Sequence, residues 1–200
     1  MTLIEQIHAS YIQQKRLDGL VRHLKEVMPK NASVLDVGCG DGRLSALLCE
    51  KRPDLVVEGI DVLQRDKTWL RVRQFNGVTI PANAASVDVV MFIDVLHHTD
   101  DPHALLREAV RVARKSIIIK DHLINGFLAE PTLRFMDWIG NARYGVASPG
   151  NYWHQSQWEE AFETLALTPV DWLEKLELYP KAVDMWFGRS LHFLARLETA

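Results

Sequence analysis

The sequence predicts a doubly wound α/β domain built on a parallel sheet covered on both faces. Three observations predict this fold. Short apolar runs and helical patterns alternate between residues 33 and 120, as repeated strand–helix units do. The strand-like runs are apolar throughout, which is typical of parallel strands buried on both faces. A turn with glycines at positions 38, 40 and 42 follows the first run and leads into a helical pattern.

The elements before residue 121 follow in a regular order. A helical pattern over residues 3–28 opens with a candidate capping box, Thr2 and Glu5, and Pro29 ends it. Asp18-Gly19 is expected to divide this pattern into two helices. Strands are expected at 33–37, 55–60, near 77–80, at 87–93 and at 116–120, with helices at 43–51 and 102–113, the second opened by Asp101.

The regular alternation stops after Asp121. Residues 122–154 are rich in glycine, proline and aromatic side chains. Ser156, with Glu159 three residues later, is expected to cap a further helix. Two final strands are expected at 169–179 and 190–197, joined by a loop that contains residues 185–187.

Length and composition limit the function classes. The 200 residues suffice for one domain with a full core, and 48% of them are hydrophobic. The formal net charge of −3 gives no electrostatic reason to expect a nucleic-acid partner. The two cysteines suggest neither a disulfide framework nor a metal site. Neither an apolar run long enough to cross a membrane nor a secretion signal is recognised, so a cytoplasmic protein is expected.

Polar residues mark the ends of the predicted strands of the core. They are Asp36, Asp61, Asp94 and Asp121-His122, together with Asn76-Gly77 if the register of the third strand is shifted slightly. Parallel strands present their carboxyl ends at one edge of the sheet, where ligands bind in open α/β folds. Buried acidic groups are costly unless they meet a polar ligand. The sequence therefore predicts a ligand site at this edge.

Two nucleotide-like ligands compete for the glycine turn. A dinucleotide fingerprint has the form Gly-x-Gly-x-x-Gly, and Arg43 stands where its third glycine belongs. S-adenosylmethionine has no phosphate but carries a sulfonium and an ammonium. The carboxylates of Asp36, Asp61 and Asp94 suit that cationic ligand.

The ordered set of motifs resembles class I S-adenosylmethionine-dependent methyltransferases of the group that methylates small molecules, quinones and lipids. The motifs are Val-Leu-Asp-Val-Gly-Cys-Gly-Asp-Gly (34–42), Glu-Gly-Ile-Asp (58–61), Ile-Pro (80–81), Ser-Val-Asp-Val-Val (86–90), Asp-Val-Leu-His-His (94–98) and Leu-Leu-Arg-Glu-Ala (105–109). The resemblance implies a Rossmann-like sheet of seven strands, mostly parallel with an antiparallel last strand. It also implies a single domain in four parts: helical cover (1–30), cofactor-binding core (31–122), acceptor-side insertion (123–155), and helix with strand pair (156–200).

The resemblance also implies the cofactor contacts. Asp61 would accept from both ribose hydroxyls, Val62 would pack on the adenine, and Asp94 would lie near the methionine ammonium. The full expected cofactor set is Asp36, Gly38, Cys39, Gly40, Asp61, Val62, Asn76, Gly77 and Asp94. For Asp36 and Asn76, a purely structural role in their turns remains a competing interpretation.

The acceptor side is less defined. His98 and His122 are candidate bases, needed only where the acceptor must lose a proton. Candidate acceptor contacts are Trp138, Arg143, Tyr144, Tyr152 and His154, and no metal ion is expected. The leading hypothesis is methyl transfer to a small-molecule acceptor by in-line displacement. The alternatives are a non-catalytic regulator or assembly protein that keeps the fold and, less favoured, a nicotinamide-dependent oxidoreductase.

Overall fold

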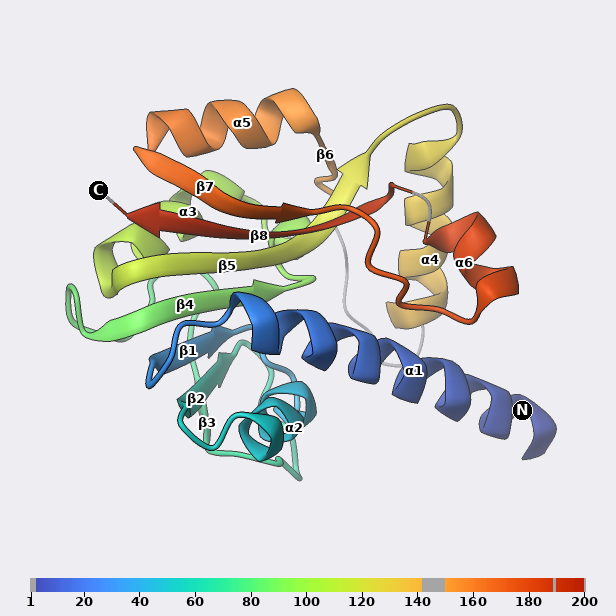
Figure 1. Cartoon of the computed structure of the whole chain (residues 1–200), viewed down its shortest axis with the longest axis horizontal. Coiled ribbons are helices and arrows are strands. Elements are labelled where there is room, and N and C mark those ends of the chain that lie inside the picture. Colours follow the sequence, from blue (N-terminus) through green and yellow to red (C-terminus); the bar gives the residue numbers. More distant parts are fainter. Residues whose placement is uncertain (1–2, 142–149, 189, 200) are drawn as a thin grey trace.

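The computed structural model describes residues 3–141, 150–188 and 190–199. Within these residues, seven strands form a twisted sheet in the order β3-β2-β1-β4-β5-β8-β7, and a short β6 pairs with β5 (Figure 1). The bounds are β1 Ser33–Val37, β2 Val56–Asp61, β3 Val72–Gln74, β4 Val87–Ile93, β5 Ala113–Ile124, β6 Trp153–His154, β7 Leu167–Leu173 and β8 His192–Thr199. Only β8 runs antiparallel to its neighbours β5 and β7. This confirms the predicted doubly wound, mostly parallel sheet.

Helices cover both faces of the sheet. Their bounds are α1 Leu3–Val27, α2 Arg43–Lys51, α3 Pro102–Val112, α4 Ala129–Asn141, α5 Gln155–Thr164 and α6 Lys181–Phe187, with a 3-10 turn, η1, at Leu96–His98. On one face, α1 and α2 pack through Leu20, Leu24 and Leu48. On the other, α3 and α5 pack through residues such as Leu106 and Trp158. The two cores explain why the central strands are apolar throughout.

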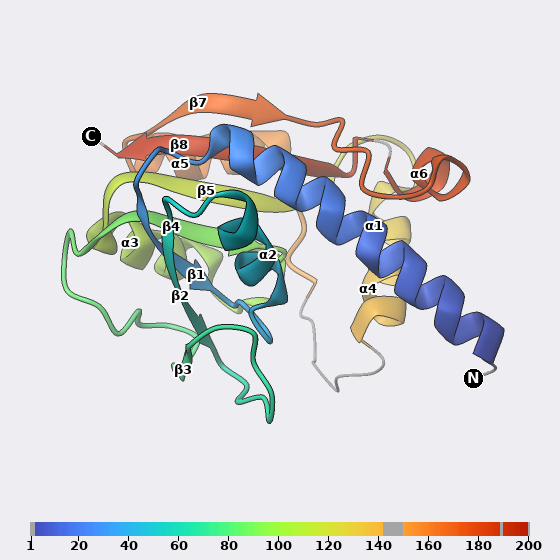
Figure 2. The same cartoon turned by 60° about the horizontal axis from the view of Figure 1, so that its bottom comes forward.

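The arrangement brings three helices to one end of the sheet. The N-terminal half of α1 extends beyond the sheet on the side where α4 and α6 lie (Figures 1 and 2). The carboxyl ends of β1, β4 and β5 point toward the same end. No helix in the described ranges is long and apolar enough to span a membrane.

Two expectations for the first part of the chain are wrong. Residues 3–27 form one helix, and Gly19 does not break it. A Cβ at Gly19 would lie 3.2 Å from Leu178 Cδ2, so the glycine allows close packing. The third strand is Val72–Gln74, not 77–80, because the latter segment turns on Asn76. Thr2 of the expected capping box lies outside the described residues.

The segment after Asp121 is more regular than expected. Strand β5 continues to Ile124, and α4 and β6 follow. Helix α5 begins one residue before Ser156, and its N-cap is His154, whose backbone N–H donates to Gln157 Oε1 at 2.9 Å. Strand β7 ends at Leu173, and the expected loop at 185–187 belongs to α6. Propensity alone misses these elements, since their helices and strands are stabilised by tertiary packing.

Candidate active site

The glycine turn after β1 leaves the backbone open to a ligand. Gly38, Gly40 and Gly42 have φ values of 75°, 61° and 77°, in the left-handed region that favours glycine. A Cβ on Gly38 would lie 2.5 Å from Val95 Cγ2, so packing requires glycine there. A Cβ on Gly40 would meet nothing within 4 Å. The surface above Gly40 is therefore a place where a ligand can approach the backbone.

Asp61 is tied directly to this turn from the end of β2. The side chain is buried, its Oδ2 accepts from the Gly40 N–H at 2.7 Å, and its Oδ1 accepts from the Leu63 N–H at 2.8 Å. Each carboxylate oxygen has a further lone pair, so both remain able to accept from a vicinal diol. The geometry fits the ribose contact expected of Asp61.

The predicted adenine side is formed by exposed residues. The Oδ1 of Asn76 accepts from the N–H groups of Val78 (3.0 Å) and Thr79 (2.8 Å), which shapes a turn. Its amide group can still donate. Gly77 has a φ of 80°, and a Cβ there would lie 3.1 Å from Val62 Cγ1. Val62 is 46% exposed, and so offers an apolar surface to a ring.

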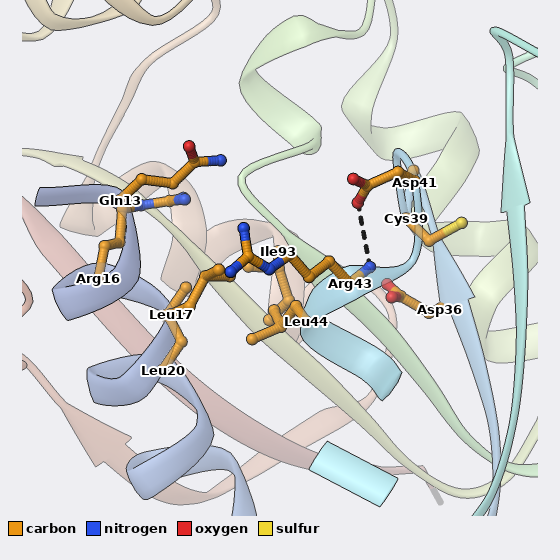
Figure 3. A pocket seen from close by; sticks show the side chains of 11 residues that line it. Gln13, Arg16, Leu17, Leu20, Asp36, Cys39, Asp41, Arg43, Leu44 and Ile93 are labelled. Carbon is orange, nitrogen blue, oxygen red and sulfur yellow. Dashed lines mark hydrogen bonds between the residues drawn. The ribbon is translucent and has the colours of Figure 1, made fainter. Parts of the chain in front are cut away.

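A cavity of about 180 Å³ lies beside the turn, between α1 and α2 (Figure 3). Its lining residues are Gln13, Arg16, Leu17, Leu20, Asp36, Gly38, Cys39, Asp41, Arg43, Leu44 and Ile93. Asp36 is the buried carboxyl of this cavity, and Ser45 donates to it at 2.6 Å. Burial raises the pKa of Asp36 to about 7. Burial also raises the pKa of the Cys39 thiol, which keeps it protonated and unsuited to nucleophilic attack.

The cavity fits the polar end of an amino-acid ligand. It presents the carboxyl of Asp36 for an ammonium, the guanidinium of Arg16 for a carboxylate, and the open backbone of Gly38. These donor and acceptor types match the methionine moiety of S-adenosylmethionine, and Asp61 matches its ribose.

Asp94 ends β4 inside a buried ionic group. Its side chain pairs with Arg16 from α1 and with Lys120 from β5, which is 1% exposed. Burial would raise the pKa of Asp94, but the two cations hold it well below its usual range. The carboxylate of Asp94 is therefore already paired with two cations. Lys120 also donates to His192 Nδ1 at 3.2 Å.

A second polar group surrounds Asp121, near the carboxyl end of β5. We define the histidine cluster as His97, His98, Asp121, His122, Asp137 and Tyr152. Asp121 is fully buried and accepts from the Leu96 N–H (2.9 Å), His97 Nδ1 (2.5 Å) and the His122 N–H (2.7 Å). Tyr152 donates to Asp137 at 2.5 Å, and the ring of Tyr152 stacks on His97.

The three histidines differ in charge. Burial favours the neutral form of His97, but Asp121, to which it is hydrogen-bonded, and the nearby carboxylate of Asp137 raise its pKa to about 10. Burial, helped by the neighbouring His97, lowers the pKa of His98 to about 4. The same two causes lower the pKa of His122. His98 and His122 are therefore neutral at pH 7, the form in which an imidazole accepts a proton.

The structure brings together only some of the predicted acceptor contacts. Tyr152 lies in the histidine cluster. Trp138 is 68% exposed on α4, and His154 caps α5 with its Nδ1 3.2 Å from the Ile124 carbonyl oxygen. Arg143 and Tyr144 lie outside the described residues. Sequence reasoning missed Arg16, Lys120, Asp137 and His192. Of these four residues, Lys120 is the one that its sequence neighbours could have indicated, because it stands inside an apolar strand directly before Asp121-His122.

The chain matches the family described as the methyltransferase domain over residues 8–170. This match covers more than half of the chain, so the chain belongs to that family. It is a class I S-adenosylmethionine-dependent methyltransferase by family, and S-adenosylmethionine is the cofactor of the class. Family membership favours this cofactor over a nicotinamide dinucleotide.

Individual relatives are more distant. The chain is 28% identical over 109 residues to the ribosomal RNA small subunit methyltransferase C of Shewanella sediminis, covering 52% of this chain and 32% of that protein. It is 28% identical over 110 residues to the 27-O-demethylrifamycin SV methyltransferase of Amycolatopsis mediterranei, covering 48% of this chain and 40% of that protein. The chain thus spans well under half the length of either relative.

Solved structures support the fold. A SAM-dependent methyltransferase from Aquifex aeolicus superposes with a TM-score of 0.65 at 18% identity, covering 96% of this chain and 98% of that one. At this identity the likeness establishes the architecture alone.

Proposed function

We propose that this protein transfers a methyl group from S-adenosylmethionine to a small-molecule acceptor. The observation that carries the proposal is the pairing of Asp61 with the Gly40 N–H beside an open glycine turn. One of the two relatives named above is a demethylrifamycin methyltransferase, which supports a small-molecule acceptor. The other is named for ribosomal RNA, a class that the net charge of −3 disfavours here.

The proposed cofactor contacts divide between the two ends of the glycine turn. Asp61 would accept the ribose hydroxyls, and Val62, Asn76 and Gly77 would form the adenine side. On the other side, Asp36, Arg16 and the Asp94 carbonyl would hold the amino-acid end, with Gly38, Cys39 and Gly40 contributing backbone. When bound, the cofactor supplies an already activated methyl group on its sulfonium. The remaining task of the protein is alignment of that group with the acceptor.

We propose that the acceptor binds between the cavity and the histidine cluster. Helix α1 would cover it, and residues 123–141 with 150–155 would form its outer wall. His98 is the stronger candidate for a base, since it is neutral and only partly buried. His122 is more buried, and its Nδ1 lies 3.3 Å from His97 Nδ1 and 3.4 Å from Asp121, away from open space.

The proposal is tested in two stages. Calorimetry with S-adenosylmethionine, S-adenosylhomocysteine and NADH first establishes the ligand. An acceptor screen over phenols, carboxylates, amines and lipids then measures release of S-adenosylhomocysteine. Binding without any turnover would favour the alternative of a non-catalytic regulator. Tight NADH binding with no binding of S-adenosylmethionine would contradict the proposal.

A further inference from the structure

The histidine cluster contains a buried nitrogen without a hydrogen bond. His97 is 1% exposed, and its Nε2 has no hydrogen-bond partner in the part of the chain that the structure describes. The carboxylate oxygen Asp137 Oδ2 lies 3.4 Å from it. Leaving a buried polar atom unpaired costs free energy. Its position opposite a carboxylate therefore points to something bound between them.

Three potential metal-ligand atoms converge at this place. His97, His122 and Asp137 each offer one, and the three atoms lie within 4.8 Å of one another. We propose that these residues hold one divalent transition cation, of which zinc fits the donors best. Two imidazole nitrogens with one carboxylate oxygen form a ligand set that zinc uses when a further coordination position stays open.

The neighbouring residues fix the donor atoms in the required orientation. His97 Nδ1 lies 2.5 Å from Asp121 Oδ1, so Nδ1 carries the proton and Nε2 is left to bind a metal. The Tyr152 hydroxyl donates to Asp137 at 2.5 Å and holds that carboxylate in place. Partners of this kind orient the ligands of metal sites.

The local charge favours a cation. Two carboxylates face the ring nitrogens of His97, with Asp121 at 2.5 Å and Asp137 at 3.4 Å. Buried charge is costly unless it is compensated. A divalent cation held by His97, His122 and Asp137 would compensate part of this negative charge.

A second set of ligand atoms nearby does not suit a cation. Asp94, His122 and His192 also converge within 4.8 Å. The Lys120 ammonium, however, pairs with Asp94 and lies 3.2 Å from His192 Nδ1. A positive charge already occupies that position, so the cation belongs with His97 and Asp137.

The role of the cation, unlike its binding, rests on the proposed function. A cation with three protein ligands keeps an open position for an oxygen of the acceptor. It would hold that oxygen beside His98, because the ring centroids of His98 and His97 lie 4.0 Å apart. Acceptors with an ionisable hydroxyl group are therefore expected to be the better substrates.

The test measures binding of the metal alone to the full chain without a purification tag. After dialysis against Zn²⁺ or Co²⁺ and gel filtration, one equivalent per chain is expected, with a visible Co²⁺ band of low-symmetry coordination. The variants H97Q, H122Q and D137N are each expected to lose this equivalent. D121N is expected to bind about 10- to 100-fold more weakly, as removal of an outer-shell partner does. The matched controls H103Q and E160Q, at exposed positions on α3 and α5, should bind as the wild type does.

Two outcomes would overturn the proposal. One is a wild type that retains no metal. The other is that H122Q and D137N, shown by circular dichroism to be folded, retain as much metal as the wild type. Because the wild-type stoichiometry is decisive by itself, a variant that fails to fold leaves the proposal testable. Binding of S-adenosylhomocysteine is measured on the same samples. Absence of S-adenosylhomocysteine binding by the wild type would contradict the proposed function, whereas a wild type that binds it but retains no metal would contradict only the cation site.

Discussion

The two halves of the site are built in different ways. In the cofactor half, a short turn, three glycines and the carboxylate of Asp61 are joined by backbone hydrogen bonds. The other half, which we call the histidine half, joins the histidine cluster to the ionic group around Asp94, whose Arg16 also borders the cofactor cavity. Charged side chains from distant segments meet there: Arg16 pairs with Asp94 across 78 positions, and Lys120 contacts His192 across 72. The first half depends on backbone conformation and the second on compensated charge. Mutations should therefore reduce ligand affinity in one and stability or turnover in the other.

The largest effect is expected at His98. Replacing a general base typically lowers turnover by about 100- to 10,000-fold. We expect H98Q to lose turnover to this extent on an acceptor that must release a proton, with S-adenosylmethionine affinity unchanged. Steady-state kinetics with the acceptor found by screening, and H103Q as control, measure the effect. Unchanged turnover would remove His98 as the base.

The next effect tests the charge balance of the histidine half. K120M leaves Asp94 with only Arg16 as a cationic partner and should lower the free energy of unfolding by about 3 kcal/mol. The exposed K175M is the matched control and should change it by about 0.5 kcal/mol or less. Urea unfolding measures both. Equal stability of the two variants would show that the buried ionic group does not depend on Lys120.

A smaller effect is expected from Asp36 in the cofactor half. Burial raises its pKa to about 7, so below that pH the free protein holds a proton there. A cationic ligand favours the ionised carboxylate, and binding must then release the proton. Affinity for S-adenosylmethionine should thus fall about tenfold per pH unit below pH 7 and level off above it. Calorimetry as a function of pH checks this dependence, which D36N should lack. A slope that persists in D36N would assign the titration to another group.

The last comparison separates two glycines of the turn, and its smallest expected effect is that of G40A. G40A should lower the free energy of unfolding by about 1 kcal/mol, because alanine is strained in the left-handed backbone conformation. It should also weaken cofactor binding, because the added Cβ points into the open space where the ligand would lie. G38A should cost a further 1 to 3 kcal/mol, roughly the penalty of overpacking, because its Cβ would meet Val95. Thermal unfolding and calorimetry compare the two. Equal destabilisation would contradict the account of Gly38.

The same contrast explains what the sequence could and could not predict. Strands such as Val87–Ile93 and the turn at Gly38–Gly42 have local signatures, and the structure has them where expected. Strand β3 has only three residues and little hydrophobic pattern, so its predicted position was wrong. Arg16 and Asp137 lie on amphipathic helices, where a charged residue looks like any solvent-facing one. They face inward only because of the tertiary structure, and no local sequence pattern indicates this.

The central claim is that Asp61 and the glycine turn hold S-adenosylmethionine. The most direct measurement is calorimetric titration of the wild type and D61N with S-adenosylhomocysteine. We expect saturable binding to the wild type at one site and affinity about 100-fold lower in D61N, because the ribose hydroxyls would lose their charged acceptor and the Gly40 and Leu63 N–H groups that shape the turn would lose theirs. No binding to the folded wild type, or equal affinity in D61N, would contradict the claim.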